Sequence, residues 1–388
     1  MKDFWNLLKV KTSVIKDIGF LGSANIFGTV ISGFFWFFLA KELGVQDYGE
    51  IQYYLAIVGM AYLISSLGTP NVIAVYVAKN IKIHPTLILI SLSGGFIALT
   101  TLFALFQRID LGILVLAFII YDMTINYFLG KKLYAKYSKY FIIQKCLMVV
   151  FGIGFYYAIG VNGIIFGIAT SYVIFIIIAF QIFRESKISF SVLRSRIGFV
   201  GNNYFERAVG GLKGEADKII IAPLLGFEIL GNYALGMQFY IILMAFSNII
   251  LKYLIPQEAS NISNKKLKKL TIIISIGISI LGILLSPIII EIFFPEYSET
   301  VITVQILSLS VTPATLGYIL ISEFLGLEKG RYVLIGRIIA LLTLITGMII
   351  LPNHFGIIGA ASSFVLSSCA QTIFFIFAKI SLKKQNLQ

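Results

Sequence analysis

Residues 39–55 read LAKELGVQDYGEIQYYL, and residues 221–237 read IAPLLGFEILGNYALGM. Each stretch contains a Leu-Gly pair, then four residues, then a second glycine. The glycines are Gly44 and Gly49 in the first stretch, and Gly226 and Gly231 in the second. Self-similarity at a fixed spacing is typical of chains that contain several copies of one structural unit. This pair of stretches therefore predicts an internal repeat, in which the glycine-rich stretch of each copy forms a tight turn after the first span of its half.

The repeat extends beyond these two stretches. Residues 18–49 align with residues 200–231 without gaps, and four glycines coincide where roughly one would by chance. A second alignment, of 139–174 with 331–366, pairs aromatic with aromatic and basic with basic: Tyr140 with Tyr332, Lys139 with Arg331, and Lys145 with Arg337. Both alignments predict that the chain contains two copies of a six-span unit.

The composition is that of a polytopic membrane protein. Hydrophobic residues make up 58% of the chain, charged residues 13%, and the mean hydropathy is +0.93, whereas soluble proteins are about a quarter charged. Apolar runs of roughly 20 residues, which cross a bilayer as helices, recur along the chain. We expect an all-α fold with about twelve spans, near residues 18–40, 51–70, 85–106, 111–130, 140–159, 163–183, 200–222, 229–251, 268–290, 301–325, 331–351 and 356–378.

These spans divide the chain into five parts. We expect a cytoplasmic N-terminal segment at 1–17, a six-helix half at 18–183, a cytoplasmic linker at 184–199, a second half at 200–378 and a cytoplasmic tail at 379–388. The first apolar run is longer than a signal-peptide core and lacks a small-residue cleavage site, so it is predicted to be a retained span.

The distribution of basic residues predicts the orientation. Most of the 31 Lys and Arg fall on the side of the two termini, and Lys41 and Arg108 alone lie in loops on the other side. Basic loops are cytoplasmic, so both termini are expected in the cytoplasm. The same bias accounts for the net charge of +13 without a nucleic-acid partner. A six-span unit returns the chain to its starting side, so the halves relate by an axis along the membrane normal, as in transporters with alternating access.

Two cysteines, Cys146 and Cys369, lie in spans without CxxC spacing. The sequence also has no spacing typical of a zinc site, a P-loop or a nucleophile elbow. We therefore expect no metal, no cofactor and no enzymatic activity.

Charged residues inside spans are functional candidates because polar groups in hydrocarbon are costly. The span at 200–222 is the richest and carries Glu206, Arg207, Lys213, Glu215, Asp217 and Lys218. One hypothesis is a self-neutralised helix, with pairs such as Lys213–Asp217 and Glu215–Lys218. The other is that Arg207, Lys213 and Lys218 bind an anionic headgroup.

Four further residues are candidates in other spans. Lys145 and Arg337 lie at matching depths in the two halves, so they either extend to the interface or clamp a pyrophosphate. Asp122 lies near the middle of span 111–130 with Asn126 one turn later. It is either a coupling site for a proton or cation, or a hydrogen-bonded packing residue. Glu323 is a weaker candidate for coupling.

Three longer segments resemble the oligosaccharide flippases, the polysaccharide-transporter branch of the multidrug/oligosaccharidyl-lipid/polysaccharide exporter superfamily. They are FFWFFLAKELGVQDYGEIQYY at 34–54, ADKIIIAPLLGFEILGNYALGMQF at 216–239 and EIFFPEYSETVITVQILSLS at 291–310. The residues in matching places are Asp217, Lys218, Leu225, Gly226, Gly231, Tyr233, Phe294, Pro295, Glu296 and Tyr297. The similarity covers most of the chain and marks the family better than the substrate.

The resemblance implies a fold and a function. The fold would be two six-helix pseudo-repeats in a V-shaped, alternating-access bundle in the inner (cytoplasmic) cell membrane. The function would be to flip an undecaprenyl-pyrophosphate-linked oligosaccharide from the cytoplasmic to the outer leaflet, for O-antigen, capsule or a related polysaccharide. A cationic cavity would take the headgroup, for which the candidates are Arg207, Lys213, Lys218, Lys145 and Arg337. Ion coupling or charge pairing would fall to Asp122, Glu206, Glu215 and Asp217.

The expected partners are the lipid-linked oligosaccharide, membrane lipids, a coupling proton or sodium ion, and other polysaccharide assembly proteins. An alternative function is a multidrug or cation antiporter of the related branch, which should depend more on acidic residues in its spans. A membrane enzyme of glycan assembly is a third hypothesis. It is disfavoured because such enzymes need a sizeable extracytoplasmic loop, and the loops on that side are short.

Overall fold

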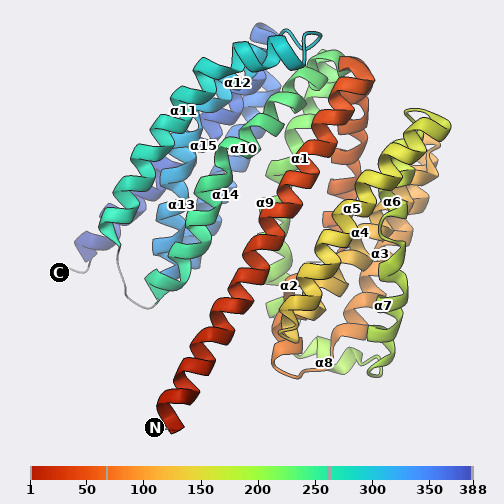
Figure 1. Ribbon diagram of the computed structural model, residues 1–388, viewed down its shortest axis with the longest axis vertical. Helices are drawn as coiled ribbons and strands as arrows, with labels where there is room; N and C mark the ends of the chain where they lie inside the picture. The colour runs from red at the N-terminus through yellow and green to blue at the C-terminus, as the bar shows by residue number, and fades with distance from the viewer. Residues whose placement is uncertain (1, 67–68, 260–263, 386–388) are drawn as a thin grey trace. The chain divides into compact units, whose positions relative to one another are not determined.

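The computed structural model describes residues 2–66, 69–259 and 264–385, and within these ranges the chain forms helices and no β-strand (Figure 1). Ten helical segments of the described chain are long and apolar enough to cross a membrane. One of them, Leu21–Ser65, is 45 residues long and contains a backbone break at Gly44, so it provides two spans. The charged helix at 197–225 is not among the ten; counted as a span, it would bring the number to the twelve expected.

The contacts divide the chain into two compact units. Unit 1 consists of Met1–Phe38 and Ile57–Ala208, and unit 2 consists of Leu39–Ala56 and Val209–Gln388. Residues around Gly44 therefore pack with the second half of the sequence. The start of helix α9 (Ile197–Leu225) packs with the first half.

Unit 1 is arranged around helix α4. Of the residues in the most apolar window of α4, 61% are buried, against 28% in α3 and 17% in α5. Figure 1 shows α3, α4, α5 and α7 running side by side, and α4 contacts each of the other three. The helices of unit 1 besides α1 (Lys2–Ser65) are α2 (Thr69–Ala78), α3 (His84–Phe106), α4 (Ile109–Gly130), α5 (Tyr134–Ile159), α6 (Gly163–Thr170), α7 (Val173–Arg184) and α8 (Phe190–Arg194).

Unit 2 has its own apolar core, to which α9, α10, α12, α13, α14 and α15 all contribute buried side chains. Buried side chains of this core include Ile221, Tyr233, Leu344, Met348 and Phe364. The outer face of α11 exposes Ile273, Ile276, Ile280, Leu284 and Ile288, as expected for a helix in contact with lipid. Besides α9 the helices are α10 (Phe227–Ala259), α11 (Lys265–Phe293), α12 (Thr300–Leu309), α13 (Val311–Gly326), α14 (Gly330–Ile350) and α15 (Pro352–Gln385).

Two predicted spans are interrupted at serines. Span 163–183 forms α6 and α7, and the Ser171 hydroxyl between them donates to the Ile168 carbonyl at 2.6 Å. Span 301–325 forms α12 and α13, and the Ser310 hydroxyl donates to the Leu307 carbonyl at 2.7 Å. Such side-chain bonds compete with the helical ladder and favour a bend. The predicted linker at 184–199 contains a helix of its own, α8.

The repeat is visible in the backbone. Gly44 and Gly226 both have positive φ, 71° and 88°, and each lies where one helix stops and the next begins. Glycine takes this conformation without strain, so the first glycine of the repeated stretch makes the predicted turn. The second glycine does not: Gly49 and Gly231 are helical and lie at a close contact between backbones. The expectation that both glycines serve the turn was wrong.

Candidate functional site

The charged residues of α9 belong to two different surroundings. Glu206 and Arg207 lie in unit 1, where Glu206 is exposed. Lys213, Glu215, Asp217 and Lys218 lie in unit 2. Each unit therefore has its own set of candidate residues.

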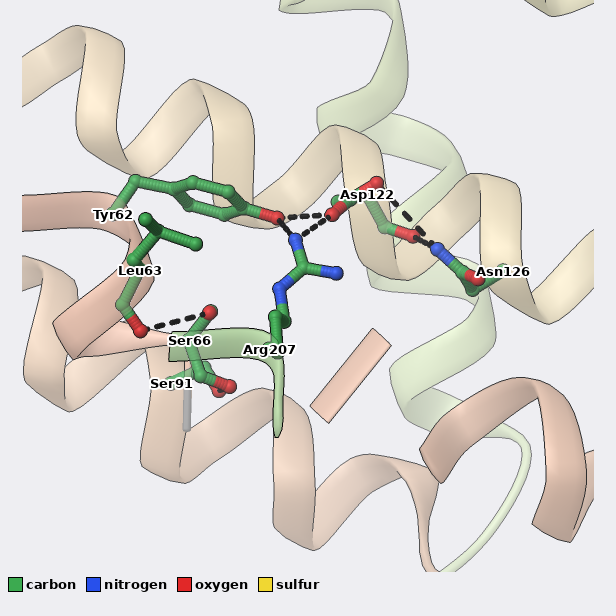
Figure 2. Close-up of polar contacts among 7 residues, drawn as sticks. All are labelled: Tyr62, Leu63, Ser66, Ser91, Asp122, Asn126 and Arg207. Carbon is green, nitrogen blue, oxygen red and sulfur yellow. Dashed lines mark hydrogen bonds and ion pairs between the residues drawn. The ribbon is translucent and has the colours of Figure 1, made fainter. Parts of the chain in front are cut away.

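In unit 1, Arg207 joins Tyr62 of α1 and Asp122 of α4 in what we call the Arg207 triad (Figure 2). The Arg207 Nη2 lies 2.6 Å from Asp122 Oδ2, and it also donates to the Tyr62 hydroxyl, which in turn donates to Asp122. The Asn126 amide donates to the Asp122 main-chain oxygen at 2.7 Å. Asp122 is therefore paired with a cation, whereas the sequence left it without a partner.

The triad is partly accessible. The side chains of Arg207 and Asp122 are 21% and 26% exposed, so a solute can reach the pair. The buried Arg207 Nε has no hydrogen-bond acceptor among the described residues, and a guanidinium has five N–H donors. The guanidinium therefore has at least one donor that its described partners do not use.

In unit 2, Lys218 is held by groups of its own helix. Its Nζ donates to the Gly214 carbonyl at 2.8 Å and lies 3.5 Å from Glu215 and 3.8 Å from Asp217. The predicted Glu215–Lys218 pair is therefore confirmed. Because two carboxylates already face this ammonium, its charge is largely neutralised.

Asp217 is fully buried. Its Oδ1 accepts from the Lys218 main-chain N–H at 2.8 Å, and its Oδ2 accepts from the Tyr233 hydroxyl of α10 at 2.9 Å. Several hydrogen bonds stabilise a carboxylate in such a place. The predicted pairing with Lys213 does not reach ion-pair distance among the described contacts, because Asp217 faces Tyr233 and Lys218.

The remaining predicted cations lie beside apolar groups or backbone. The Lys213 Nζ is 5.6 Å from the ring centroid of Phe364 on α15, and the Lys145 Nζ is 5.7 Å from that of Phe141. Neither lysine has a carboxylate within ion-pair distance in the described chain. An Arg337 Nη1 on α14 lies against α9, 3.6 Å from the position a Cβ on Gly210 would take.

Sequence reasoning missed a charged network in unit 2. Lys268 of α11 lies 2.8 Å from Glu258 of α10 and 2.6 Å from Glu323 of α13. Lys379 of α15 lies 2.5 Å from the other oxygen of Glu323. Glu323 was expected to be a weak coupling candidate, and it instead connects two cations. Tyr62 was also missed, because nothing marks it among the 20 tyrosines of the chain. Tyr233 lies in a segment that resembles the family, but its bond to Asp217 was not predicted.

The helices define a multi-pass membrane protein with charged groups inside its spans. Compared by sequence, the chain matches no family model and no curated protein. Compared by structure, it is similar to the lipid II flippase MurJ in an inward closed conformation, with a TM-score of 0.76 and 13% identity over 92% of this chain and 87% of that chain.

A second similar structure is a multidrug resistance MATE family transporter of the MOP superfamily. Its inward-facing conformation has a TM-score of 0.71 and 12% identity over 93% of this chain and 95% of that chain. The outward-facing conformation of such a transporter has a TM-score of 0.66 and 14% identity over 96% of this chain and 97% of that chain. The chain therefore has the twelve-helix pseudo-repeat fold of these transporters. This confirms the predicted fold class, and the resemblance to the superfamily at the level of the fold.

Proposed function

We propose that this protein is a flippase that moves an undecaprenyl-pyrophosphate-linked oligosaccharide from the cytoplasmic to the outer leaflet, for O-antigen, capsule or a related polysaccharide. The proposal includes an inner-membrane location, cytoplasmic termini and functional halves at 18–183 and 200–378. The partners would be the lipid-linked oligosaccharide, membrane lipids, a coupling proton or sodium ion, and other polysaccharide assembly proteins.

The observation that carries this proposal is a pair of lysines with no carboxylate of the described chain within ion-pair distance. Lys145 lies in the candidate span Tyr134–Ile159 and Lys213 in the proposed span formed by α9. Neither has an ion pair within the described residues, and Asp217 acts on Lys213 only from beyond ion-pair distance. Ionised groups without a partner are costly in such a place, and an anionic headgroup would supply the missing charge. The similarity to a lipid II flippase supports the same class of substrate.

The contacts separate the predicted headgroup residues into two roles. Lys218 is bound to Gly214, Glu215 and Asp217, so we assign it a structural role in α9. Lys213, Lys145 and Arg337 would contact the headgroup directly. Arg207 would do so in competition with Asp122.

The MATE similarity favours an antiporter as the second candidate function. An antiporter would need carboxylates that a cation can approach. Asp217 is buried and bonded to Tyr233 and Lys218, and Asp122 is bonded to Arg207 and Tyr62. Because both carboxylates have partners, the flippase is the better account.

The experiment is flipping in proteoliposomes, with a fluorescent undecaprenyl-pyrophosphate oligosaccharide and a membrane-impermeant quencher. We expect protein-dependent exposure of the label. Lys213→Ala should slow this exposure by about tenfold or more, because a charge-assisted bond contributes about 1.5–3 kcal/mol. The matched control is Lys266→Ala, which removes an exposed lysine of the same unit and should not change the rate.

Two results would contradict the proposal. The first is no exposure of the label by protein that exchanges drugs or cations along an ion gradient, which would establish the antiporter. The second is equal flipping by the wild type and by a Lys145→Ala/Lys213→Ala double variant, which would remove the cationic residues from headgroup binding.

A further inference from the structure

A small pocket with several charged lining residues lies in unit 1, and none of its lining residues belongs to the Arg207 triad. Its volume is about 70 Å³, and its polar lining residues are Asn80, Lys82, His84, Lys131 and Glu185. We propose that this pocket binds a singly charged phosphate group, either the phosphodiester of a membrane phospholipid or inorganic phosphate. The inference concerns a different site from the flippase proposal and does not depend on it.

The pocket is formed where several helices end. Helix α2 ends at Ala78, and Asn80 then takes a left-handed conformation with φ 56°, which turns the chain toward α3. Helix α3 begins at His84, and α4 ends at Gly130 just before Lys131. Because α3 and α4 are candidate membrane spans, their ends lie at the depth of the lipid headgroups. A basic pocket between span ends is a recurrent form of headgroup site.

His84 is the residue that points to a ligand. Its side chain lines the pocket although the residue is only 4% exposed, and its ring packs edge-on against Tyr127 with centroids 5.4 Å apart. The Ile182 carbonyl is a weak backbone hydrogen-bond partner of the ring, and neither ring nitrogen makes a hydrogen bond of normal distance and angle with any described residue. Buried polar groups nearly always have a partner, so an acceptor in the pocket would satisfy the N–H of this imidazole.

The charges of the lining select the kind of acceptor. Lys82 and Lys131 are exposed and provide two positive charges, and the Lys131 Nζ lies 5.5 Å from the Tyr127 ring centroid. Glu185 provides one negative charge, and its carboxylate already accepts the Tyr127 hydroxyl. With a neutral His84 the lining carries one net positive charge, which one phosphate monoanion would balance. Two lysines beside the pocket also disfavour a metal cation.

The test uses the purified full chain in detergent and two probes, phosphatidylglycerol and inorganic phosphate. Phosphatidylglycerol binding is measured by native mass spectrometry, and phosphate binding by the rise in unfolding temperature against chloride at equal ionic strength. The pocket variant is Lys82→Ala/Lys131→Ala. The matched control is Lys79→Ala/Lys136→Ala, which removes two exposed lysines of the same unit that do not line the pocket.

We expect at least one probe to bind the pocket variant about tenfold or more weakly than the control variant, as the loss of two charge-assisted bonds implies. A difference with phosphatidylglycerol alone identifies a lipid headgroup, and one with phosphate alone identifies the free ion. We also expect His84→Phe, which keeps the ring packing against Tyr127, to weaken binding of the same probe.

Two outcomes overturn the proposal. If the pocket variant and the control variant bind both probes equally, the lysines act only through net charge. If the lysine pair weakens binding but His84→Phe does not, binding belongs to the surface lysines and not to the buried site.

Discussion

Gly49 and Gly231 face each other where α1 and α10 cross in unit 2: a methyl group on Gly49 would lie 2.8 Å from the main-chain nitrogen of Gly231. That methyl group would also collide with the Phe227 carbonyl oxygen, and one on Gly231 would collide with the Val45 carbonyl oxygen. Val45 and Phe227 occupy equivalent places, each four residues before a repeated glycine. Each copy of the repeated stretch therefore supplies one side of the same contact.

We predict that Gly49→Ala and Gly231→Ala each destabilise the protein by about 1–3 kcal/mol or more, because the atoms in the way are backbone and cannot rotate aside. The measurement is the unfolding temperature of the purified protein in detergent. Gly277→Ala in α11 is the control, since nothing lies within 4 Å of its added methyl group, and it should be neutral or slightly stabilising. Equal unfolding temperatures for Gly231→Ala and Gly277→Ala would contradict the close contact.

The fold was predictable because it depends on local properties of the sequence. Apolar length determines the spans, and the spacing of glycines identified α9 as a span despite its six charges. The repeat is also visible in the packing: Tyr140 stacks on Phe128 with centroids 5.6 Å apart, and its equivalent Tyr332 stacks on Phe324 at 5.5 Å.

The site was predictable only where partners are neighbours in sequence. Glu215 and Lys218 are three residues apart on one helix, so their pairing follows from helical geometry. Arg207 and Asp122 are 85 residues apart, and no local pattern marks which carboxylate lies opposite a given cation. The same limit concealed the bond from Tyr233 to Asp217, which decides that this carboxylate does not pair with Lys213.

Tyr297 forms another contact with the region around Gly44. Its buried hydroxyl donates to the Ala40 carbonyl at 2.6 Å and the Gly44 carbonyl at 3.1 Å, at the end of a helical stretch where carbonyls lack helical partners. We predict that Tyr297→Phe destabilises the protein by about 1–3 kcal/mol, because these buried acceptors lose their donor. Tyr157→Phe is the matched control, as Tyr157 is 68% exposed.

This contribution should depend on pH in one direction. Burial, with smaller effects of Tyr48 and Glu296, raises the pKa of Tyr297 above its ordinary value, so the folded protein keeps the phenol protonated. The stabilisation is therefore complete below the ordinary tyrosine pKa of about 10 and declines as the pH rises above it, where the unfolded chain ionises. Chemical unfolding of wild type and Tyr297→Phe from pH 8 to 11 measures this. If the difference in free energy of unfolding between the two proteins grew with pH, the Tyr297 hydroxyl would not be a buried donor.

The Arg207 triad allows charge pairing and anion binding to be tested separately. Asp122→Asn and Arg207→Gln should each destabilise the protein, since each leaves one charge without its partner. We predict that the double variant loses less stability than the two single variants lose together. The difference should be about 0.5–3 kcal/mol in the free energy of unfolding, as expected for groups in direct contact. The unfolding temperatures of the wild type, the two single variants and the double variant measure this difference. Asn126→Ala serves as a neighbouring control.

The rate at which the same four proteins flip lipid-linked oligosaccharide tests whether Arg207 binds an anion. The double variant keeps a neutral, folded triad but lacks the guanidinium, so we predict that it flips lipid-linked oligosaccharide poorly despite its recovered stability. Wild-type flipping by the double variant would show that Arg207 only balances Asp122. Strict additivity of the two substitutions would show that the pair contributes nothing to stability.

The last prediction concerns the charged network around Lys268. This ammonium lies between Glu258 and Glu323 and is 11% exposed, so salt screens it weakly. Lys268→Met should destabilise unit 2 by about 3–5 kcal/mol, because two carboxylates lose their shared cation. Lys266→Met, at an exposed position of the same helix turn, should change little. Adding Glu258→Gln should restore part of the loss, since Glu258 then carries no charge. Thermal unfolding measures all three variants, and equal losses for Lys268→Met and Lys266→Met would show that the network does not stabilise the fold.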